Sequence, residues 1–267
     1  MTTALVTGAS AGLGAEFARQ LAATGHDLVL VARTEARLRE LATALEAAHG
    51  IRTEVLPADL ADRDDVERVA RRVAGDGPTG PVDLLVNNAG FGLRTGFLDS
   101  DVAEEERMLD VMCRATLVLS HAAGRAMAAR GHGGILTVSS VASFVAMGTY
   151  SAAKAWETVF SEGLAQELAP RGVAVTAVCP GFTRTEFHDR ADMTMSHLPN
   201  SMWLDAEKVV ADALADLRRR RAISVPGRPY RALVGVLGAT PRPVVARVSS
   251  ALARRRRPAR AAGKADR

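Results

Sequence analysis

The sequence predicts a single α/β domain in which a parallel β-sheet is covered by helices on both faces. Strand-like and helix-like segments alternate along the chain, which is the pattern of parallel strands joined by crossover helices. The strand-like segments are apolar at successive positions, as expected for strands that are buried on both faces. The chain of 267 residues shows no internal repeat and no linker before residue 240, so one domain accounts for its length.

Each expected element follows from its residue pattern. The first helix repeats Leu13, Phe17 and Leu21 at intervals of four, which places them on one face. The second helix has Thr34 at its expected N-cap and Gly50 at its expected end. The expected strands are 3–7, 27–31, 53–56, 84–86, 135–138, 173–178 and 223–225, and the expected helices are 12–24, 34–49, 63–73, 103–130 and 150–169. Residues 183–204 lack a regular period and are expected to form a loop-helix segment over the carboxyl ends of the strands.

Composition and charge disfavour several classes of protein. Cys113 and Cys179 have no CxxC or Cys/His spacing, which argues against a disulfide framework or a metal site and favours the reducing cytoplasm. No apolar stretch has the length of a membrane span, and the amino terminus does not resemble a signal peptide. Nine basic residues and one acidic residue lie in 242–267, a net +8, so the rest of the chain sums to −4 of the total +4. An acidic body without a matching motif argues against nucleic-acid binding, and the lack of GxSxG argues against a serine hydrolase.

A glycine-rich turn, from Thr7 to Gly14 (TGASAGLG), joins the first strand to the first helix. Its glycines permit a tight turn and a close approach of backbone amides to a pyrophosphate, and the helix N-terminus adds partial positive charge. A plain strand-to-helix turn is the alternative interpretation. The residues expected to contact a dinucleotide here are Gly8, Ser10, Gly12, Leu13 and Gly14.

Arg33 follows the second strand directly and sets the expected form of the cofactor. An acidic residue at that point would bind the adenosine ribose and repel a 2′-phosphate, whereas the fork of an arginine suits phosphate. Asp27 begins the same strand and therefore lies at the wrong end for the ribose. The sequence thus predicts NADP(H), with Arg37 one helical turn further along as a weaker second phosphate ligand.

Four more motifs follow the later strands. They are Asp59-Leu60 after the third strand, NNAG from Asn87 to Gly90, YSAAK from Tyr150 to Lys154 behind Ser139-Ser140, and CPGFTRT from Cys179 to Thr185. With the glycine turn, these motifs occur in the order found in the short-chain dehydrogenase/reductase family, which the chain resembles over residues 3–228. The resemblance implies a Rossmann-type, doubly wound, seven-stranded parallel sheet and a homodimer or homotetramer. It assigns cofactor contacts to Asp59, Leu60, Asn87, Ala89, Gly90, Tyr150, Lys154, Pro180, Gly181, Thr183 and Thr185, with a helix N-cap as the alternative role of Asp59.

Tyr150 and Lys154 carry the expected chemistry, because an i, i+4 pair lies on one face of a helix. A free tyrosine has a pKa near ~10, and a neighbouring ammonium favours its phenolate. The resemblance implies that Tyr150 transfers the proton, Lys154 supports it and holds the nicotinamide ribose, and Ser140 polarises the substrate carbonyl. The ten-residue gap from Ser140 to Tyr150 is short for the family, which makes Ser143 a minor rival.

Met112 departs from the family pattern. In the stretch DVMCRA from Asp110 to Ala115, it occupies the position where many relatives place an asparagine that anchors a water near the lysine. A thioether cannot hold that water through a side-chain hydrogen bond. We expect an altered proton relay, so that Met112→Asn changes turnover and leaves cofactor affinity unchanged. A non-catalytic NADP(H)-binding sensor or scaffold is the alternative.

Aromatic and methionine side chains gather in the segments expected around the nicotinamide, although aromatic residues make up only 4% of the chain. They predict a small-molecule carbonyl or alcohol substrate of hydrophobic character, with core packing as the alternative. The expected substrate contacts are Phe91, Phe144, Phe182, Phe187 and Trp203.

The expected dehydrogenase domain is 1–229, including the substrate segment 183–204, and an apolar and basic extension occupies 230–267. A subunit contact followed by a disordered end is the favoured interpretation of this extension. An interfacial helix held to acidic lipid by its arginines is the second, and it would make a cytoplasmic protein peripherally membrane-associated.

Overall fold

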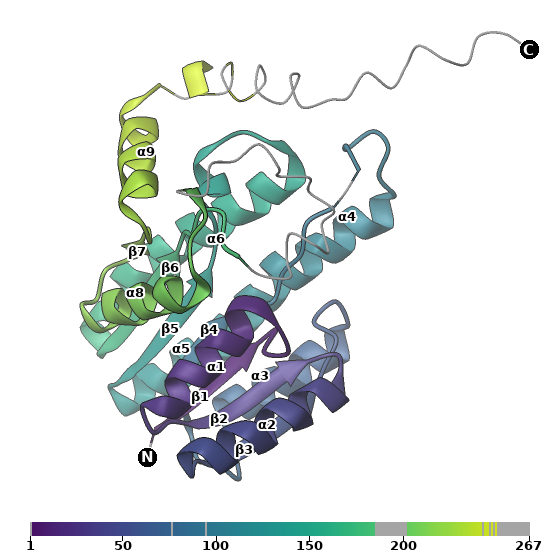
Figure 1. Ribbon diagram of the computed structural model, residues 1–267, viewed down its shortest axis with the longest axis vertical. Helices are drawn as coiled ribbons and strands as arrows, with labels where there is room; N and C mark the ends of the chain where they lie inside the picture. The colour runs from purple at the N-terminus through teal and green to yellow at the C-terminus, as the bar shows by residue number, and fades with distance from the viewer. Residues whose placement is uncertain are drawn as a thin grey trace, which may run out of the picture.

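Seven parallel strands form one sheet in the order β3-β2-β1-β4-β5-β6-β7 in the computed structural model (Figure 1). The structure describes residues 2–75, 77–93, 95–184, 202–241, 243–245, 247 and 249. The strands are β1 (Thr3–Thr7), β2 (Asp27–Ala32), β3 (Thr53–Pro57), β4 (Val82–Asn87), β5 (Gly133–Val138), β6 (Val173–Val178) and β7 (Ile223–Ser224). The strand order reverses between β1 and β4, which confirms the doubly wound, Rossmann-type sheet of seven strands.

Helices cover both faces of this sheet, and the two layers can be followed in Figure 1. The main helices are α1 (Gly12–Ala23), α2 (Glu35–His49), α3 (Arg63–Ala74), α4 (Val102–Leu109), α5 (Ala115–Arg130), α6 (Gly148–Leu168), α8 (Ala206–Arg218) and α9 (Arg228–Ala239). Short turns are η1 (Asp110–Arg114), η2 (Val141–Phe144) and η3 (Ala169–Arg171). Helices α1, α2 and α8 pack on one face, and α3, α5 and α6 pack on the other.

The apolar runs of the sequence supply both layers of the core. In β2, Leu28 and Leu30 contact the first layer, whereas Val29 and Val31 contact the second, because successive strand side chains point to opposite faces. Burial of each such side chain contributes about 1.5–3 kcal/mol to folding. A strand buried on both faces therefore needs apolar residues at every position.

The helix expected at 103–130 has an interruption in the structure. The α-helical segments α4 and α5 are separated by η1, a π-helical turn that contains Met112. A π-helical turn inserts an extra residue and is frequent at functional sites. Helix α8 lies in a part of the sequence for which no helix was expected. Gly50 ends α2 in the left-handed conformation (φ 65°), as expected.

Helix α9 follows β7 and contacts η2, at the end of the sheet where the site lies. Its Tyr230 is 2% exposed, although most of the helix is open to solvent. Within the part of the chain that the structure describes, no helix combines the length and apolar character needed to cross a bilayer.

Candidate active site

The glycine turn between β1 and α1 depends on residues without a side chain. Gly8 has a left-handed φ of 65°, and Gly14 lies directly against it. A Cβ on Gly14 would lie 2.2 Å from the carbonyl oxygen of Gly8, so any larger residue would open the turn. This tight turn begins α1 at the carboxyl edge of the sheet.

Asn88 locks the turn to the neighbouring strand β4. Its side-chain nitrogen Nδ2 donates to the carbonyl oxygens of Thr7, at 2.9 Å, and Gly8, at 3.3 Å. The backbone amides of Asn88 and Ala89 donate to the Thr7 hydroxyl at 2.9 and 3.1 Å. Asn87 turns the other way, since its side chain donates to Ser120 on α5 at 3.0 Å. Asn88, absent from the expected contacts, is thus the side chain of the NNAG motif that shapes the turn.

The N-terminus of α1 suits a phosphate group. Ala11 occupies its N-cap without a side-chain hydrogen bond, and no acidic residue lies in the first turn. The first backbone amides of the helix are therefore left without a side-chain acceptor, next to the turn formed by Gly8. These donors fit the diphosphate of a dinucleotide.

Arg33, Asp59 and Arg107 meet at the ends of β2 and β3. Arg33 is exposed directly after β2. The Asp59 carboxylate accepts a 2.6 Å hydrogen bond from Arg107 on α4. Burial acts to raise the pKa of Asp59, but the hydrogen bonds from Arg107 and the Ala61 amide, with the charges of Arg107 and Arg33, lower it below its ordinary value. The N-cap of α3 is Asp62, so the alternative role of Asp59 is wrong, and Arg107 is a neighbour that the sequence did not suggest.

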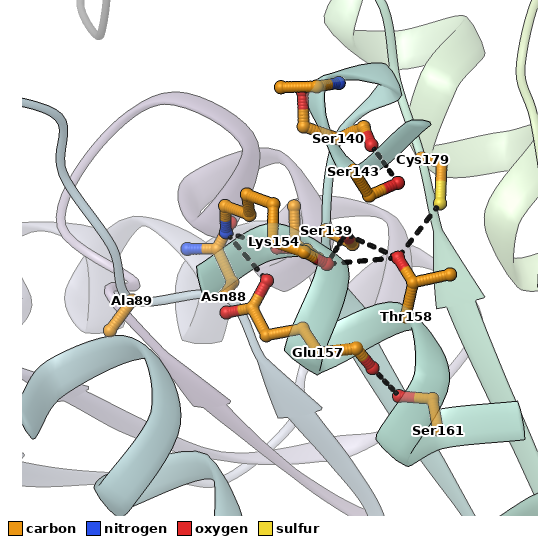
Figure 2. Close-up of polar contacts among 12 residues, drawn as sticks. Asn88, Ala89, Ser139, Ser140, Ser143, Lys154, Glu157, Thr158, Ser161 and Cys179 are labelled. Carbon is orange, nitrogen blue, oxygen red and sulfur yellow. Dashed lines mark hydrogen bonds and ion pairs between the residues drawn. The ribbon is translucent and has the colours of Figure 1, made fainter. Parts of the chain in front are cut away.

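The serines after β5 have different surroundings (Figure 2). Ser139 is buried, and its hydroxyl points toward α6, where it donates to the carbonyl oxygen of Lys154 at 2.8 Å. Ser140 accepts from the Ala142 amide at 3.1 Å, as the N-cap of η2, and is hydrogen-bonded to Tyr150. Ser143 donates to the Ser140 carbonyl oxygen at 2.7 Å. Among these three, the hydroxyl of Ser140 is the one that is joined to Tyr150.

Tyr150 and Lys154 lie on one face of α6, and the lysine Nζ is 5.8 Å from the centre of the tyrosine ring. Lys154 is buried and donates to the Val138 carbonyl oxygen at 2.7 Å. Burial raises the pKa of Tyr150 above its ordinary value; Glu157 adds to the rise, while Lys154 and the hydrogen bond with Ser140 oppose it. The structure therefore brings together the three side chains expected to be catalytic.

Glu157 is a fourth member of this cluster that the sequence reasoning missed. Its Oε2 lies 2.9 Å from the Lys154 Nζ, and both side chains are buried (Figure 2). Burial raises the pKa of Glu157 to about 7, against the opposing pull of Lys154. Burial lowers the pKa of Lys154, but the charges of Glu157 and Tyr150 outweigh this and leave it raised. The spacing i, i+4, i+7 from Tyr150 through Lys154 to Glu157 was the available signal, since it places all three on one helical face.

Met112 fills the position next to this cluster. It is fully buried and packs with Met108, Ala153 and Tyr150. A Cβ on Gly90 would lie 3.4 Å from Met112 Cγ and 3.6 Å from Lys154 Nζ, so Met112 and the lysine border the same glycine. Apolar packing, rather than an amide, therefore occupies the place beside Lys154.

The remaining expected contacts are placed only in part. Phe91 packs beside Met112, and Phe144 ends η2. The rings of Phe182 and Trp203 are 6.1 Å apart and tilted by 54°. Thr183 is buried, and its hydroxyl donates to the Gly181 carbonyl oxygen at 3.1 Å. The expected contacts Thr185 and Phe187 lie outside the described residues.

Tyr230 joins the two ends of the substrate segment. Its hydroxyl donates to the Met202 carbonyl oxygen at 2.7 Å and accepts from the Phe182 amide at 3.1 Å. A Cβ on Gly181 would lie 2.1 Å from the Tyr230 ring, so the glycine of the PG motif makes room for this tyrosine. Phe182 and Leu204 also bond through their backbones. Tyr230 was expected to begin a separate extension, yet it supports the loop after β6.

A dinucleotide-binding turn at the switch point of a doubly wound sheet, beside a Ser–Tyr–Lys cluster, defines an oxidoreductase of the Rossmann type. The family model described as short chain dehydrogenase matches residues 2–195. The chain belongs to the short-chain dehydrogenase/reductase family, whose members bind NAD(P)(H).

Similar proteins include enzymes and a solved complex. The chain is 42% identical over 185 residues to the very-long-chain 3-oxoacyl-CoA reductase of Podospora anserina, covering 66% of this chain and 53% of that protein. It thus spans about half the length of that curated relative. A short-chain dehydrogenase from Sphingobium yanoikuyae in complex with NADPH has a TM-score of 0.82 and 34% identity, covering 99% of this chain and 100% of that one. The bulky-bulky ketone specific alcohol dehydrogenase from Comamonas testosteroni has a TM-score of 0.78 and 30% identity, covering 98% and 97%.

Proposed function

We propose that this oxidoreductase uses NADP(H) to interconvert a carbonyl and an alcohol in a hydrophobic small molecule. The observation that carries the proposal is the cluster of Ser140, Tyr150 and Lys154 at the carboxyl end of β5, across from the glycine turn. A proton donor, an ammonium and a hydroxyl gathered in one cluster are the groups that carbonyl reduction requires.

The chemistry divides among the three side chains. The bound cofactor supplies or accepts the hydride. The Ser140 hydroxyl hydrogen-bonds the substrate oxygen and, through its bond with Tyr150, brings that oxygen to the phenol. Tyr150 donates its proton to the oxygen in reduction and accepts it in oxidation, while Lys154 stabilises the phenolate and holds the nicotinamide ribose.

Arg33 supports NADP(H) over NAD(H). Its guanidinium is exposed at the end of β2, beside Asp59, where the adenosine end of a dinucleotide lies in this fold. A guanidinium pairs with a 2′-phosphate through charge-assisted hydrogen bonds. The other cofactor contacts that we propose, from the adenosine end to the nicotinamide end, are Gly8, Ser10, Gly12, Leu13, Gly14, Asp59, Leu60, Asn87, Ala89, Gly90, Pro180, Gly181, Thr183 and Thr185.

A hydrophobic substrate fits the apolar side chains around the cluster. Phe91 and Tyr150 pack against the same apolar cluster of Met108, Met112 and Ala153, and the Phe182–Trp203 pair follows β6. We propose these residues, with Phe144 and Phe187, as the substrate contacts. The name of the Comamonas testosteroni relative, which specifies bulky ketones, agrees with this class.

The test is a panel of carbonyls and alcohols followed through the absorbance of NADPH and, in parallel, NADH. Aryl and long-chain ketones should be reduced faster than short polar ones, and NADPH should be preferred. Tight NADPH binding without turnover of any substrate would overturn the proposal in favour of a sensor or scaffold. Equal rates with NADH and NADPH would contradict the proposed preference for NADP(H) but not the proposed reaction.

We also propose that the protein assembles as a homodimer or homotetramer through α5 and α6. Leu117 is 46% and Val159 65% exposed on these helices, and Trp156 stacks on Phe160 at 4.8 Å. Exposed apolar side chains of this size mark a site of association. Light scattering checks the assembly, and a monomer at micromolar concentration would exclude it.

For the C-terminal extension we propose a subunit contact, with peripheral binding to acidic lipid as the second interpretation. Leu233 and Val236 on α9 are exposed and apolar, and the arginine-rich residues 250–267 lie outside the described residues. Flotation with acidic liposomes distinguishes the two, since only the second predicts that the protein rises with the lipid.

A further inference from the structure

The partner of Lys154 in this chain is a buried carboxylate. Glu157 lies one helical turn after the lysine, and its Oε2 is 2.9 Å from the Nζ. Among the described residues, Oε2 has no hydrogen-bond partner apart from this ammonium. Removal of two charges from water is costly, and it is offset only when the charges are close together. The short distance between Glu157 and Lys154 is therefore what allows both charges to be buried.

Within the part of the chain that the structure describes, no second charge acts on this pair. Besides Tyr150, the described titratable groups that interact with it are two thiols, Cys113 of η1 and Cys179 directly after β6. Burial raises the pKa of both thiols to about 11, so they are neutral at working pH. The charge facing Tyr150 is consequently that of the Lys154–Glu157 pair.

Building on the proposed roles of Tyr150 and Lys154, we infer that Glu157 is a positioning residue. Its carboxylate holds the Lys154 ammonium in place and cancels much of the positive charge that the tyrosine faces. Met112, on the adjacent π-helical turn, leaves no amide or hydroxyl there to perform this task. The buried ion pair anchors the lysine together with the carbonyl oxygen of Val138.

The pair has a direct consequence for proton transfer. An unpaired ammonium would stabilise the phenolate of Tyr150 strongly, whereas Glu157 acts in the opposite sense on the pKa of the tyrosine. Tyr150 consequently keeps its proton to higher pH than it would beside a lone lysine. A protonated tyrosine is the form that reduces carbonyls, so Glu157 extends reduction to higher pH.

The test is a tyrosinate titration, read by ultraviolet absorbance on the full chain without cofactor or substrate. The chain has two tyrosines, so subtraction of the Tyr150→Phe curve isolates Tyr150. Glu157→Gln should move the Tyr150 midpoint down by about one pH unit, because a nearby negative charge is lost. Glu157→Asp, which keeps the charge, should stay nearer the native midpoint.

The matched control is Glu167→Gln, which removes a carboxylate from an exposed position on the same helix and should leave the midpoint unchanged. If Glu157→Gln lowers the melting temperature but leaves the midpoint in place, the pair is structural and the inference is wrong. An upward shift would also overturn it. The titration does not depend on turnover, so an inactive chain would refute the proposed function and leave this readout standing.

In an active chain, the pH profile gives a second readout. The alkaline decline of kcat/KM for reduction and the rise of kcat/KM for oxidation should both move to lower pH in Glu157→Gln. The reason is that the protonated tyrosine serves reduction and the phenolate serves oxidation. Uniform loss of activity at every pH would contradict the assigned role.

Discussion

The cofactor half and the catalytic half of the site are built by different means. Around the glycine turn, neutral groups form the structure: the Asn88 amide, the Thr7 hydroxyl and backbone carbonyls. Around Tyr150, the structure is held by charge, in the buried pair of Lys154 and Glu157. The cofactor half presents hydrogen-bond donors to a ligand, whereas the catalytic half sets the pKa of Tyr150.

This difference predicts how each half responds to change. Loss of one neutral hydrogen bond weakens a turn and therefore binding, with little effect on any pKa. Loss of one charge in a buried pair alters the protonation of its neighbours, with effects on rate. Substitutions in the two halves should thus separate cofactor affinity from turnover.

Tyr150→Phe should have the largest effect. Loss of the proton donor is expected to lower kcat by about 10²–10⁴-fold, because the ring remains but the hydroxyl is gone. NADPH affinity, measured by fluorescence titration, should remain within a few-fold. The matched variant is Tyr230→Phe, which removes the other tyrosine hydroxyl of the chain and should lower kcat far less, because that hydroxyl supports the loop after β6 and transfers no proton. Equal losses in the two variants would contradict the assignment.

Asn88→Ala should have the next largest effect, in the cofactor half. It leaves the carbonyl oxygens of Thr7 and Gly8 without their side-chain donor, which should lower the free energy of unfolding by about 1–3 kcal/mol. Urea denaturation measures this loss, and NADPH affinity should fall with it. If Asn88→Ala lowers kcat but leaves the affinity for NADPH unchanged, the proposed division between the two halves is wrong.

Arg33→Ala should have the smallest effect on turnover and stability, because its consequence is confined to the choice of cofactor. Loss of a charge-assisted hydrogen bond to phosphate, worth about 1.5–3 kcal/mol, should reduce the preference for NADPH over NADH by roughly tenfold or more. Arg39→Ala is the control, since Arg39 is an exposed arginine paired with Glu35 on α2. Competitive binding measures the ratio of the NADPH and NADH affinities. If this ratio is unchanged in Arg33→Ala, Arg33 does not contact the cofactor phosphate.

Much of the fold was predictable because its signals are local. The apolar runs and the helical periods fixed the order of strands and helices, and the glycine turn and the YxxxK pair lie where those patterns placed them. The π-helical turn was not predictable, since its i→i+5 bonding leaves no distinct residue pattern in the stretch around Met112. Helix α8, for which no helix was expected, begins after its N-cap Asp205, whose side chain accepts a hydrogen bond from the Glu207 amide.

The parts of the site that were missed depend on tertiary contact. The partners of Asn88 are backbone carbonyls of Thr7 and Gly8, far away in sequence, and Arg107 meets Asp59 only when the fold brings α4 next to the turn after β3. Glu157 differs, because its spacing from Lys154 was visible in the sequence. A charged side chain on a helix is usually solvated, so only the buried position revealed its role.

The contacts of Tyr230 with Gly181, Phe182 and Met202 join α9 to the loop after β6. Because the Tyr230 hydroxyl bonds to the Phe182 amide and the Met202 carbonyl oxygen, a ligand that shifts either residue also acts on α9. A fluorophore at Val236, exposed on α9, would therefore report occupancy from a distance. For the same reason, a shortened chain for lipid experiments should end after Thr240, since an end at residue 229 would remove a buried side chain from the site.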